Sequence, residues 1–320
     1  MCCMSDEVVR YRSAVCDSLR WERLSPRRDD IIISTPAKCG TTWMQMICAL
    51  LIFQRTTFDR PLGLISPWLD MQTRSIDEVV ADLDMQQNRR FIKTHTPLDG
   101  LRYDADITYI CVGRDPRDVA LSWANHEDNS DFEAFLSARE RAVGLDDLAE
   151  IYADWVPPDT KALDPLARFW AWVESDAPIA LAASSLASMM HHLATFWAVR
   201  DRSNVVLVHY SDLQRDLQGE MCRIAERLGI PIAEDVLPQL VAAAQFDAMR
   251  ERADELAPET HHGSWHDNRN FFHAGRHGQW RTLLDDDNAQ RRYAARVREL
   301  AAPDLADWAH YGTLEFESES

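Results

Sequence analysis

The chain has 320 residues, of which 46% are hydrophobic, and its 34 Lys+Arg against 52 Asp+Glu give a formal net charge of −18 at pH 7. This length fits one large domain, because single cores stop growing at roughly 250–300 residues. The acidic balance disfavours nucleic acid or an anionic membrane surface as the main partner.

The longest purely apolar run, residues 46–53, is far shorter than the roughly 18–20 residues that span a bilayer. The first ten residues lack the apolar segment of a signal peptide. The seven cysteines form no spaced CxxC pair, which argues against a disulfide framework and against a zinc site. We therefore expect a cytoplasmic protein with reduced thiols.

Short runs rich in branched residues predict four buried parallel strands, at residues 30–35, 90–95, 107–113 and 204–210. Helical patterns follow three of them, at residues 41–53, 115–126 and 212–230. Asp115 is placed to cap the second helix, Pro116 to begin it, and Gly229 to end the third. Alternating strands and helices predict an α/β fold with a mostly parallel sheet, whose ligands bind at the carboxyl ends of the strands. We expect a single domain over residues 1–320, with a variable insertion around 124–200.

The loop after the first strand, STPAKCGTTW, has the composition of an anion-binding turn. A glycine-containing turn into a helix directs backbone N–H groups at one spot and adds the positive end of the helix dipole. The candidate phosphate cradle consists of Lys38, Cys39, Gly40, Thr41 and Thr42. The nucleotide-kinase form of this loop, GxxxxGK[ST], has its lysine after the glycine, whereas Lys38 precedes Gly40. A polar turn capped by threonines is the alternative.

Cationic side chains also follow the next two strands. Period-two alternation places Lys93 and His95 on one face at the end of the second strand, and Arg114 is at the tip of the third, eight residues before Ser122. A lone histidine could be a hydrogen-bonded core residue, and Arg114 could form a surface ion pair with Asp115 or Asp118. Cations at three adjacent strand ends of an acidic protein nevertheless favour an anion site.

These segments resemble the soluble PAPS-dependent sulfotransferases. TPAKCGTTW is similar to that family's 5′-phosphosulfate loop, KTHTP to its KTHxP segment, and YICVGRDPRDVALS to its 3′-phosphate segment. The segments VVLVHYSDLQRDLQGEMCRIAERLGI and FHAGRHGQW resemble two later parts of the family pattern. The resemblance covers nearly the whole chain and is greatest to bacterial enzymes that sulfate glycolipids or phenols. It implies a P-loop-like doubly wound fold, with a central parallel sheet flanked by helices.

The resemblance also implies roles for the matching residues, with PAPS as co-substrate and PAP as product. Its cofactor-binding residues would be Lys38, Cys39, Gly40, Thr41, Thr42, Trp43, Arg114, Ser122, Tyr210, Phe246, Gly275 and Arg276. Lys38 would lie near the bridging oxygen of the phosphosulfate, and Trp43 would stack on adenine. Phe246 could instead belong to a buried helix face, and Trp43 could be ordinary core packing.

Three residues would act in catalysis. His95 is the natural general base, because an ordinary histidine pKa of about 6.5 leaves it largely neutral. Lys38 and Lys93 would offset charge on the sulfonate and on the leaving phosphate, and these roles require no metal.

Two departures from the family pattern lead to predictions. Cys39 replaces the usual serine beside Lys38 at a helix N-terminus, which predicts a lowered thiol pKa and reactivity; an inert buried thiol is the alternative. The late loop lacks the usual Arg-Lys pair that clamps the 3′-phosphate. His273 or Arg276, folding back across Gly275, would replace the pair, and we favour Arg276 because its charge is permanent.

Aromatic and methionine side chains within the expected insertion predict an apolar acceptor wall, for a phenol, a sterol or a lipid-linked sugar. They are Trp155, Phe169, Trp170, Trp172, Met189, Met190, Phe196 and Trp197, and core packing is the alternative for each. Five histidines, at 261, 262, 266, 273 and 277, are interrupted by glycines that prevent their alignment on one helix, so we expect no metal. A P-loop nucleotide kinase and a catalytically silent nucleotide-binding module remain as other functions, and the oligomeric state stays open.

Overall fold

The computed structural model describes residues 8–258, 263–272 and 275–313. Its central sheet has four parallel strands in the order β2-β1-β3-β4. These strands are β1 (Ile31–Ser34), β2 (Phe91–Thr94), β3 (Thr108–Gly113) and β4 (Val205–His209). All four predicted strands are confirmed, each within a residue or two of its expected ends.

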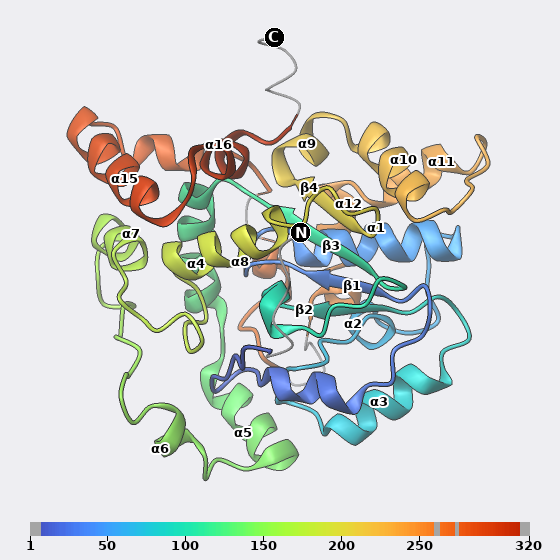
Figure 1. Cartoon of the computed structure of the whole chain (residues 1–320), viewed down its shortest axis with the longest axis horizontal. Helices are drawn as coiled ribbons and strands as arrows, with labels where there is room; N and C mark the ends of the chain where they lie inside the picture. The colour runs from blue at the N-terminus through green and yellow to red at the C-terminus, as the bar shows by residue number, and fades with distance from the viewer. Residues whose placement is uncertain (1–7, 259–262, 273–274, 314–320) are drawn as a thin grey trace.

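Helices surround the sheet (Figure 1). In chain order they are α1 (Thr41–Phe53), α2 (Leu62–Ile65), α3 (Ile76–Met85), α4 (Pro116–Asn129), α5 (Phe132–Val143), α6 (Leu148–Ile151), α7 (Pro165–Val173), α8 (Leu186–Trp197), α9 (Tyr210–Arg215), α10 (Leu217–Arg227), α11 (Leu237–Ala243), α12 (Phe246–Glu251), α13 (Ala253–Leu256), α14 (Asn268–Phe271), α15 (Asp287–Leu300) and α16 (Pro303–Tyr311). None of these helices is long and apolar enough to span a bilayer.

The helix ends follow local sequence signals, with one difference from expectation. The Asp115 side chain accepts a hydrogen bond from the Arg117 N–H, and Pro116 begins α4, as predicted. The helix expected over residues 212–230 is divided into α9 and α10. Asp216 interrupts it, because its carboxylate accepts a hydrogen bond from the Gly219 N–H at 2.8 Å and begins a new helix there.

Side-chain alternation along the strands produces a core on each face of the sheet. Ile31 and Ile33 pack with α1, α10 and α13 on one face. Ile32 and Tyr109 pack on the other face with α4, α7, α8, α15 and α16. Figure 1 shows α1, α10 and α11 on one side of the sheet and α4, α8 and α15 on the other. This three-layer arrangement is the predicted α/β fold.

The strand order also locates a crevice. From β1 the chain first adds β2 on one side and then β3 on the other, so the order reverses between β1 and β3. Ligands of open parallel sheets bind at such a switch point, beyond the carboxyl ends of the strands. The loop 35–40 follows β1 and Arg114 follows β3, so both begin at this crevice.

Candidate active site

The loop between β1 and α1 turns sharply at two residues. Lys38 has φ +67° and Gly40 has φ +106°, both in the left-handed region. A side chain at Gly40 would be strained by this φ, and its Cβ would come within 3.0 Å of the Tyr210 ring. Helix α1 begins immediately afterwards at Thr41, and the N–H groups of its first turn have no partner within the helix. The loop therefore presents Lys38 and a helix N-terminus to the same space.

Arg114 connects this loop with the late loop around residue 275. Its Nη1 donates to the Lys38 carbonyl at 2.9 Å, and its Nη2 donates to the Arg276 carbonyl at 3.4 Å. The guanidinium lies 4.3 Å above the Tyr210 ring. Its buried Nε has no hydrogen-bond partner among the described residues. The expected alternative, an ion pair with Asp115 or Asp118, is wrong, because Asp115 pairs with Arg117 instead.

Asp118 has a different task, which is to hold the late loop. Its buried carboxylate accepts hydrogen bonds from the N–H groups of Gly278 at 2.6 Å and Gln279 at 2.9 Å. The Trp280 indole donates to Asp115 Oδ2 at 3.0 Å. The first turn of α4 therefore fixes the late loop beside Arg114.

Lys38 contacts an aromatic ring and an imidazole. Its Nζ lies 4.6 Å from the Phe271 ring centre and 3.4 Å from His126 Nδ1, and it forms no ion pair with a described carboxylate. Burial, followed by repulsion from Arg114 and Lys93, lowers the pKa of Lys38 to about 7. A buried cation without a carboxylate partner is costly unless an anion binds beside it, so the residues present fit an anionic group.

His95 has a fixed tautomer. Its Nδ1 lies 2.7 Å from the Thr35 carbonyl, which can only accept, so Nδ1–H donates and Nε2 keeps its lone pair. Burial and the adjacent Lys93 lower the pKa of His95 well below its usual value. The imidazole is therefore neutral and has an unprotonated nitrogen, as a general base requires.

Two residues that the sequence analysis did not single out hold His95 in place. The Trp68 ring packs edge-to-face with the imidazole, with ring centres 4.6 Å apart. Lys93 Nζ lies over the Trp68 ring, 4.4 Å from its centre. Asp70 is fully buried and accepts the hydroxyls of Thr94 and Thr96, the residues on either side of His95. The end of β2 is thereby fixed from two directions.

An aromatic recess adjoins the phosphate loop. The Trp43 and Tyr210 rings meet at 5.2 Å, and the Trp43 indole donates to the Ala244 carbonyl at 2.8 Å. Gly275 packs so closely on Phe246 that a Cβ there would lie 2.5 Å from the ring. The late loop therefore contacts Phe246 directly.

Most of the predicted site residues line one cavity of about 530 Å³. These are Lys38, Gly40, Thr41, Thr42, Trp43, Lys93, His95, Arg114, Ser122, Tyr210, Phe246 and Gly275. Two described residues of the predicted set do not line it. Cys39 is fully buried in the core, and Arg276 is exposed. His273, the other candidate in the late loop, lies outside the described residues.

The predicted apolar wall is wrong in its composition. Of its eight side chains, all described, Phe169, Trp172, Met189, Met190 and Phe196 are buried in the core between α7, α8 and the sheet, with Trp170 and Trp197 packed against them. Trp155 does not line the cavity either. Other aromatic residues line it instead: Trp68, Trp123, Phe132, Phe135, Tyr152, Trp265 and Phe271.

His126 is another cavity residue that the sequence analysis missed. It lies four residues after Ser122 on α4, a spacing that places both on one helix face and could have identified it. Its ring lies between Trp123, at 5.2 Å, and Trp265, at 5.0 Å. Burial and the charge of Lys38 lower the pKa of His126 well below its usual value. The described residues contain no group of three or more His, Cys, Asp or Glu side chains arranged to hold a metal.

Comparison with known proteins decides the family. A sequence model of the sulfotransferase domain matches residues 28–301. A glycolipid sulfotransferase of Mycobacterium tuberculosis is 43% identical over 323 residues, covering 98% of this chain and 97% of that protein. The chain belongs to the sulfotransferase family. Human sulfotransferase 2B1 is a more distant relative of this sulfotransferase, 25% identical over 70% of this chain and 53% of that protein.

Solved structures agree on the fold of this sulfotransferase. Retinol dehydratase in complex with androsterone and PAP has a TM-score of 0.65 at 18% identity, covering 90% of this chain and 89% of that chain. Mouse sulfotransferase SULT7A1 complexed with PAP has a TM-score of 0.64 at 16% identity, covering 94% and 92%. The family membership decides against the nucleotide-kinase and silent-module alternatives.

The Cys39 thiol of this sulfotransferase differs from the sequence prediction of a reactive thiol. Burial raises its pKa to about 12, more than offsetting the charge of Arg114, so the predicted lowered pKa is wrong. We expect iodoacetamide to leave Cys39 unmodified in the folded enzyme, while the exposed Cys222 reacts. Peptide mass spectrometry with a parallel activity assay measures both. If Cys39 is modified, activity is lost and PAP prevents both, the original prediction of a reactive thiol is correct.

Proposed function

We propose that this sulfotransferase moves a sulfuryl group from PAPS to a hydroxyl of an apolar or lipid-like acceptor and releases PAP. The observation that carries the proposal is the single cavity shared by three cations, a neutral histidine and an aromatic wall. The cations would bind the negatively charged groups of the nucleotide, and the aromatic wall would bind an apolar acceptor.

The donor side is assigned from the contacts around the phosphate loop. Lys38 and the first turn of α1 would bind the 5′-phosphosulfate, and Arg114 with Ser122 would bind the 3′-phosphate. The unpartnered Nε of Arg114 supports this role, since a phosphate would satisfy it. Trp43, Tyr210 and Phe246 would enclose the adenine ring.

The acceptor side is assigned to the end of β2. His95 Nε2 would take the proton of the attacking hydroxyl, and Lys93 would stabilise negative charge beside it. Sulfuryl transfer needs little protein chemistry beyond in-line placement, charge stabilisation and removal of this proton. The chain's own contribution is to hold the acceptor oxygen near His95 while Lys38 faces the leaving group.

A glycolipid is one acceptor that fits. Mycobacterial relatives at 43% identity carry the name glycolipid sulfotransferase. Phe132, Tyr152 and Pro157, from the variable region that we place at 124–200 of a single domain, line the apolar part of the cavity. We further propose a cytoplasmic enzyme, because its described cysteines are free thiols.

Release of PAP from PAPS tests the function. A panel should include a phenol, a sterol, a glycolipid and a small charged alcohol, with His95→Ala as the blank. We expect PAP release with the apolar acceptors and little with the charged one. No release with any acceptor, or a clear preference for the charged alcohol, would overturn the proposal.

Arg276 provides a separate prediction about the 3′-phosphate. Its carbonyl is bound by Arg114, which places the residue beside the assigned phosphate site. We expect Arg276→Ala to weaken PAP binding by roughly tenfold, because a charged hydrogen bond is worth about 1.5–3 kcal/mol. Adenosine 5′-phosphate, which lacks the 3′-phosphate, should bind the variant and the parent equally in calorimetry. If neither Arg276→Ala nor His273→Arg changes PAP affinity, the late loop does not close on the nucleotide.

A further inference from the structure

Part of the cavity wall is a segment without regular structure, residues 11–16, which we name the N-terminal strap. Five of its residues line the cavity: Tyr11, Ser13, Ala14, Val15 and Cys16. Apart from two isolated bridges the strap belongs to no helix or strand. Such a segment opens easily unless side chains from the rest of the fold hold it.

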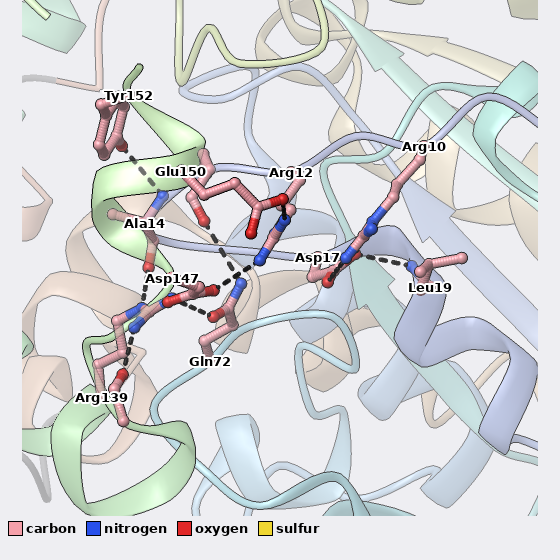
Figure 2. Close-up of polar contacts among 12 residues, drawn as sticks. Arg10, Arg12, Ala14, Asp17, Leu19, Gln72, Arg139, Asp147, Glu150 and Tyr152 are labelled. Carbon is pink, nitrogen blue, oxygen red and sulfur yellow. Dashed lines mark hydrogen bonds and ion pairs between the residues drawn. The ribbon is translucent and has the colours of Figure 1, made fainter. Parts of the chain in front are cut away.

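Arg139 on α5 binds the strap through a hydrogen bond to Ala14 (Figure 2). Its side chain is 0% exposed, and its Nε donates to the Ala14 carbonyl at 2.9 Å. Nη2 donates to Gln72 Oε1 at 2.7 Å and to Asp147 Oδ1 at 2.8 Å, and Nη1 donates to the Gly144 carbonyl. A buried guanidinium needs its N–H groups satisfied, so Arg139 fixes these four acceptors relative to one another.

The other main-chain group of Ala14 is held as well. Its N–H donates to the Tyr152 hydroxyl at 3.0 Å, and the Tyr152 side chain also lines the cavity. Both polar groups of one strap residue are therefore bound by side chains from residues 139–152. Figure 2 shows Arg139 and Tyr152 on either side of Ala14.

Further contacts fix the strap on both sides of Ala14. Arg12 donates to Asp147 and to Glu150, each at 3.0 Å, so Asp147 joins Arg12 to Arg139. Although desolvation opposes it, hydrogen bonds from Arg139 and Arg12 lower the pKa of Asp147, which therefore stays ionised near neutral pH. The Arg12 N–H also donates to the Ala180 carbonyl, in a segment that lines the same cavity.

We propose that Arg139 is a positioning residue for acceptor binding, which sets the width of the acceptor cavity, and hence acceptor specificity, through the N-terminal strap. The inference rests on the proposed function, since it takes this part of the cavity as the acceptor site. The donor residues are attached to β1, β3 and the late loop, whereas Arg139 acts on the strap, Gln72 and the α5–α6 connection. Loss of Arg139 should therefore weaken the acceptor and spare the nucleotide.

The test compares Arg139→Met with Arg141→Met, an exposed arginine on the same helix. KM and kcat are measured for a naphthol and for a bulkier sterol, and PAP affinity is measured by calorimetry. We expect Arg139→Met to raise acceptor KM by about tenfold and to reduce the discrimination between the two acceptors. PAP affinity should stay within about twofold of the parent, and Arg141→Met should behave as the parent.

Two outcomes would overturn the proposal: an unchanged acceptor KM in folded Arg139→Met, or equal losses in acceptor KM and PAP affinity. Should Arg139→Met fail to fold, Tyr152→Phe keeps the ring and removes only the bond to the Ala14 N–H. That variant should raise acceptor KM by roughly two- to tenfold, the worth of one hydrogen bond, and no rise would equally refute the role.

A binding measurement separates this inference from the proposed function. Trp68, Trp123 and Trp265 line the cavity, so quenching of tryptophan fluorescence follows naphthol binding without turnover. If the parent enzyme releases no PAP, the proposed function fails, but naphthol affinity still tests the strap. Equal naphthol affinity of the parent and Arg139→Met would refute the strap proposal by itself.

Discussion

Turnover of His95→Ala falls by roughly 10²–10⁴-fold or more, the usual contribution of a general base, while PAP affinity is kept. The reason is the tautomer: the Thr35 carbonyl accepts the hydrogen bond from Nδ1–H, so Nε2 of this cavity-lining histidine stays free to accept a proton. Single-turnover release of PAP at saturating acceptor measures the effect, and calorimetry with PAP measures the retained binding.

His126 provides the sharpest comparison, because it is a second neutral imidazole in the same cavity. Its Nδ1 lies 3.4 Å from Lys38 Nζ, whereas Nδ1 of His95 is bound by the Thr35 carbonyl. His126→Phe should therefore reduce turnover less than His95→Ala does, and His266→Gln, at an exposed position, should have no effect. Near-normal turnover in His95→Ala together with inactivity of His126→Phe would move the base to His126.

Replacing Lys38 with methionine should lower turnover by roughly 10²–10³-fold, as removal of one preorganised charge-stabilising group does elsewhere. Methionine keeps most of the apolar stem against Phe271 but removes the only cation from residues 36–42. The loss should appear in kcat and in PAP affinity, since in the proposed complex the amine would face both the leaving group and the product phosphate. Rates with saturating PAPS separate the two. Unchanged kcat in a folded Lys38→Met variant would exclude Lys38 from the transfer step.

The same lysine predicts a pH dependence. In the free enzyme burial and the charges of Arg114 and Lys93 bring its pKa to about 7, and bound phosphate should raise that pKa. Below pH 7 the amine is protonated with or without PAP, so this group leaves affinity constant. Above pH 7 binding must take up a proton, and PAP affinity should fall by up to about tenfold per pH unit. Calorimetry between pH 6.5 and pH 9, in buffers with different ionisation enthalpies, measures the pH dependence of PAP affinity and the number of protons taken up on binding. Lys38→Met should abolish both.

Much of the site follows from sequence because its residues are attached to strand ends. His95 and Arg114 come directly after β2 and β3, and Lys38 is in the loop after β1, so the order of these neighbouring parallel strands brings them together. Cys39 was mispredicted because the local features, a lysine and a helix N-terminus, contain no information on exposure. Cys39 is buried in the core with Ile32 and Tyr109, and this burial raises its pKa.

The acceptor wall was harder to predict for a different reason. Phe169 and Trp172 belong to a helix whose orientation on the sheet decides which face is buried, and composition does not reveal that orientation. The strap has no periodic pattern at all. It is held by Arg139, 125 residues later in the chain, so only the tertiary structure connects the two.

The way in which Ala14 is held has a consequence for variation among enzymes of this kind. The Arg139 and Tyr152 side chains bind the main chain of residue 14, and main-chain groups are the same whatever the side chain is. Ala14 lines the cavity, and its methyl group takes no part in these bonds. Replacing Ala14 by another small residue would therefore change the space offered to an acceptor. The two hydrogen bonds that attach the strap to the fold would stay the same.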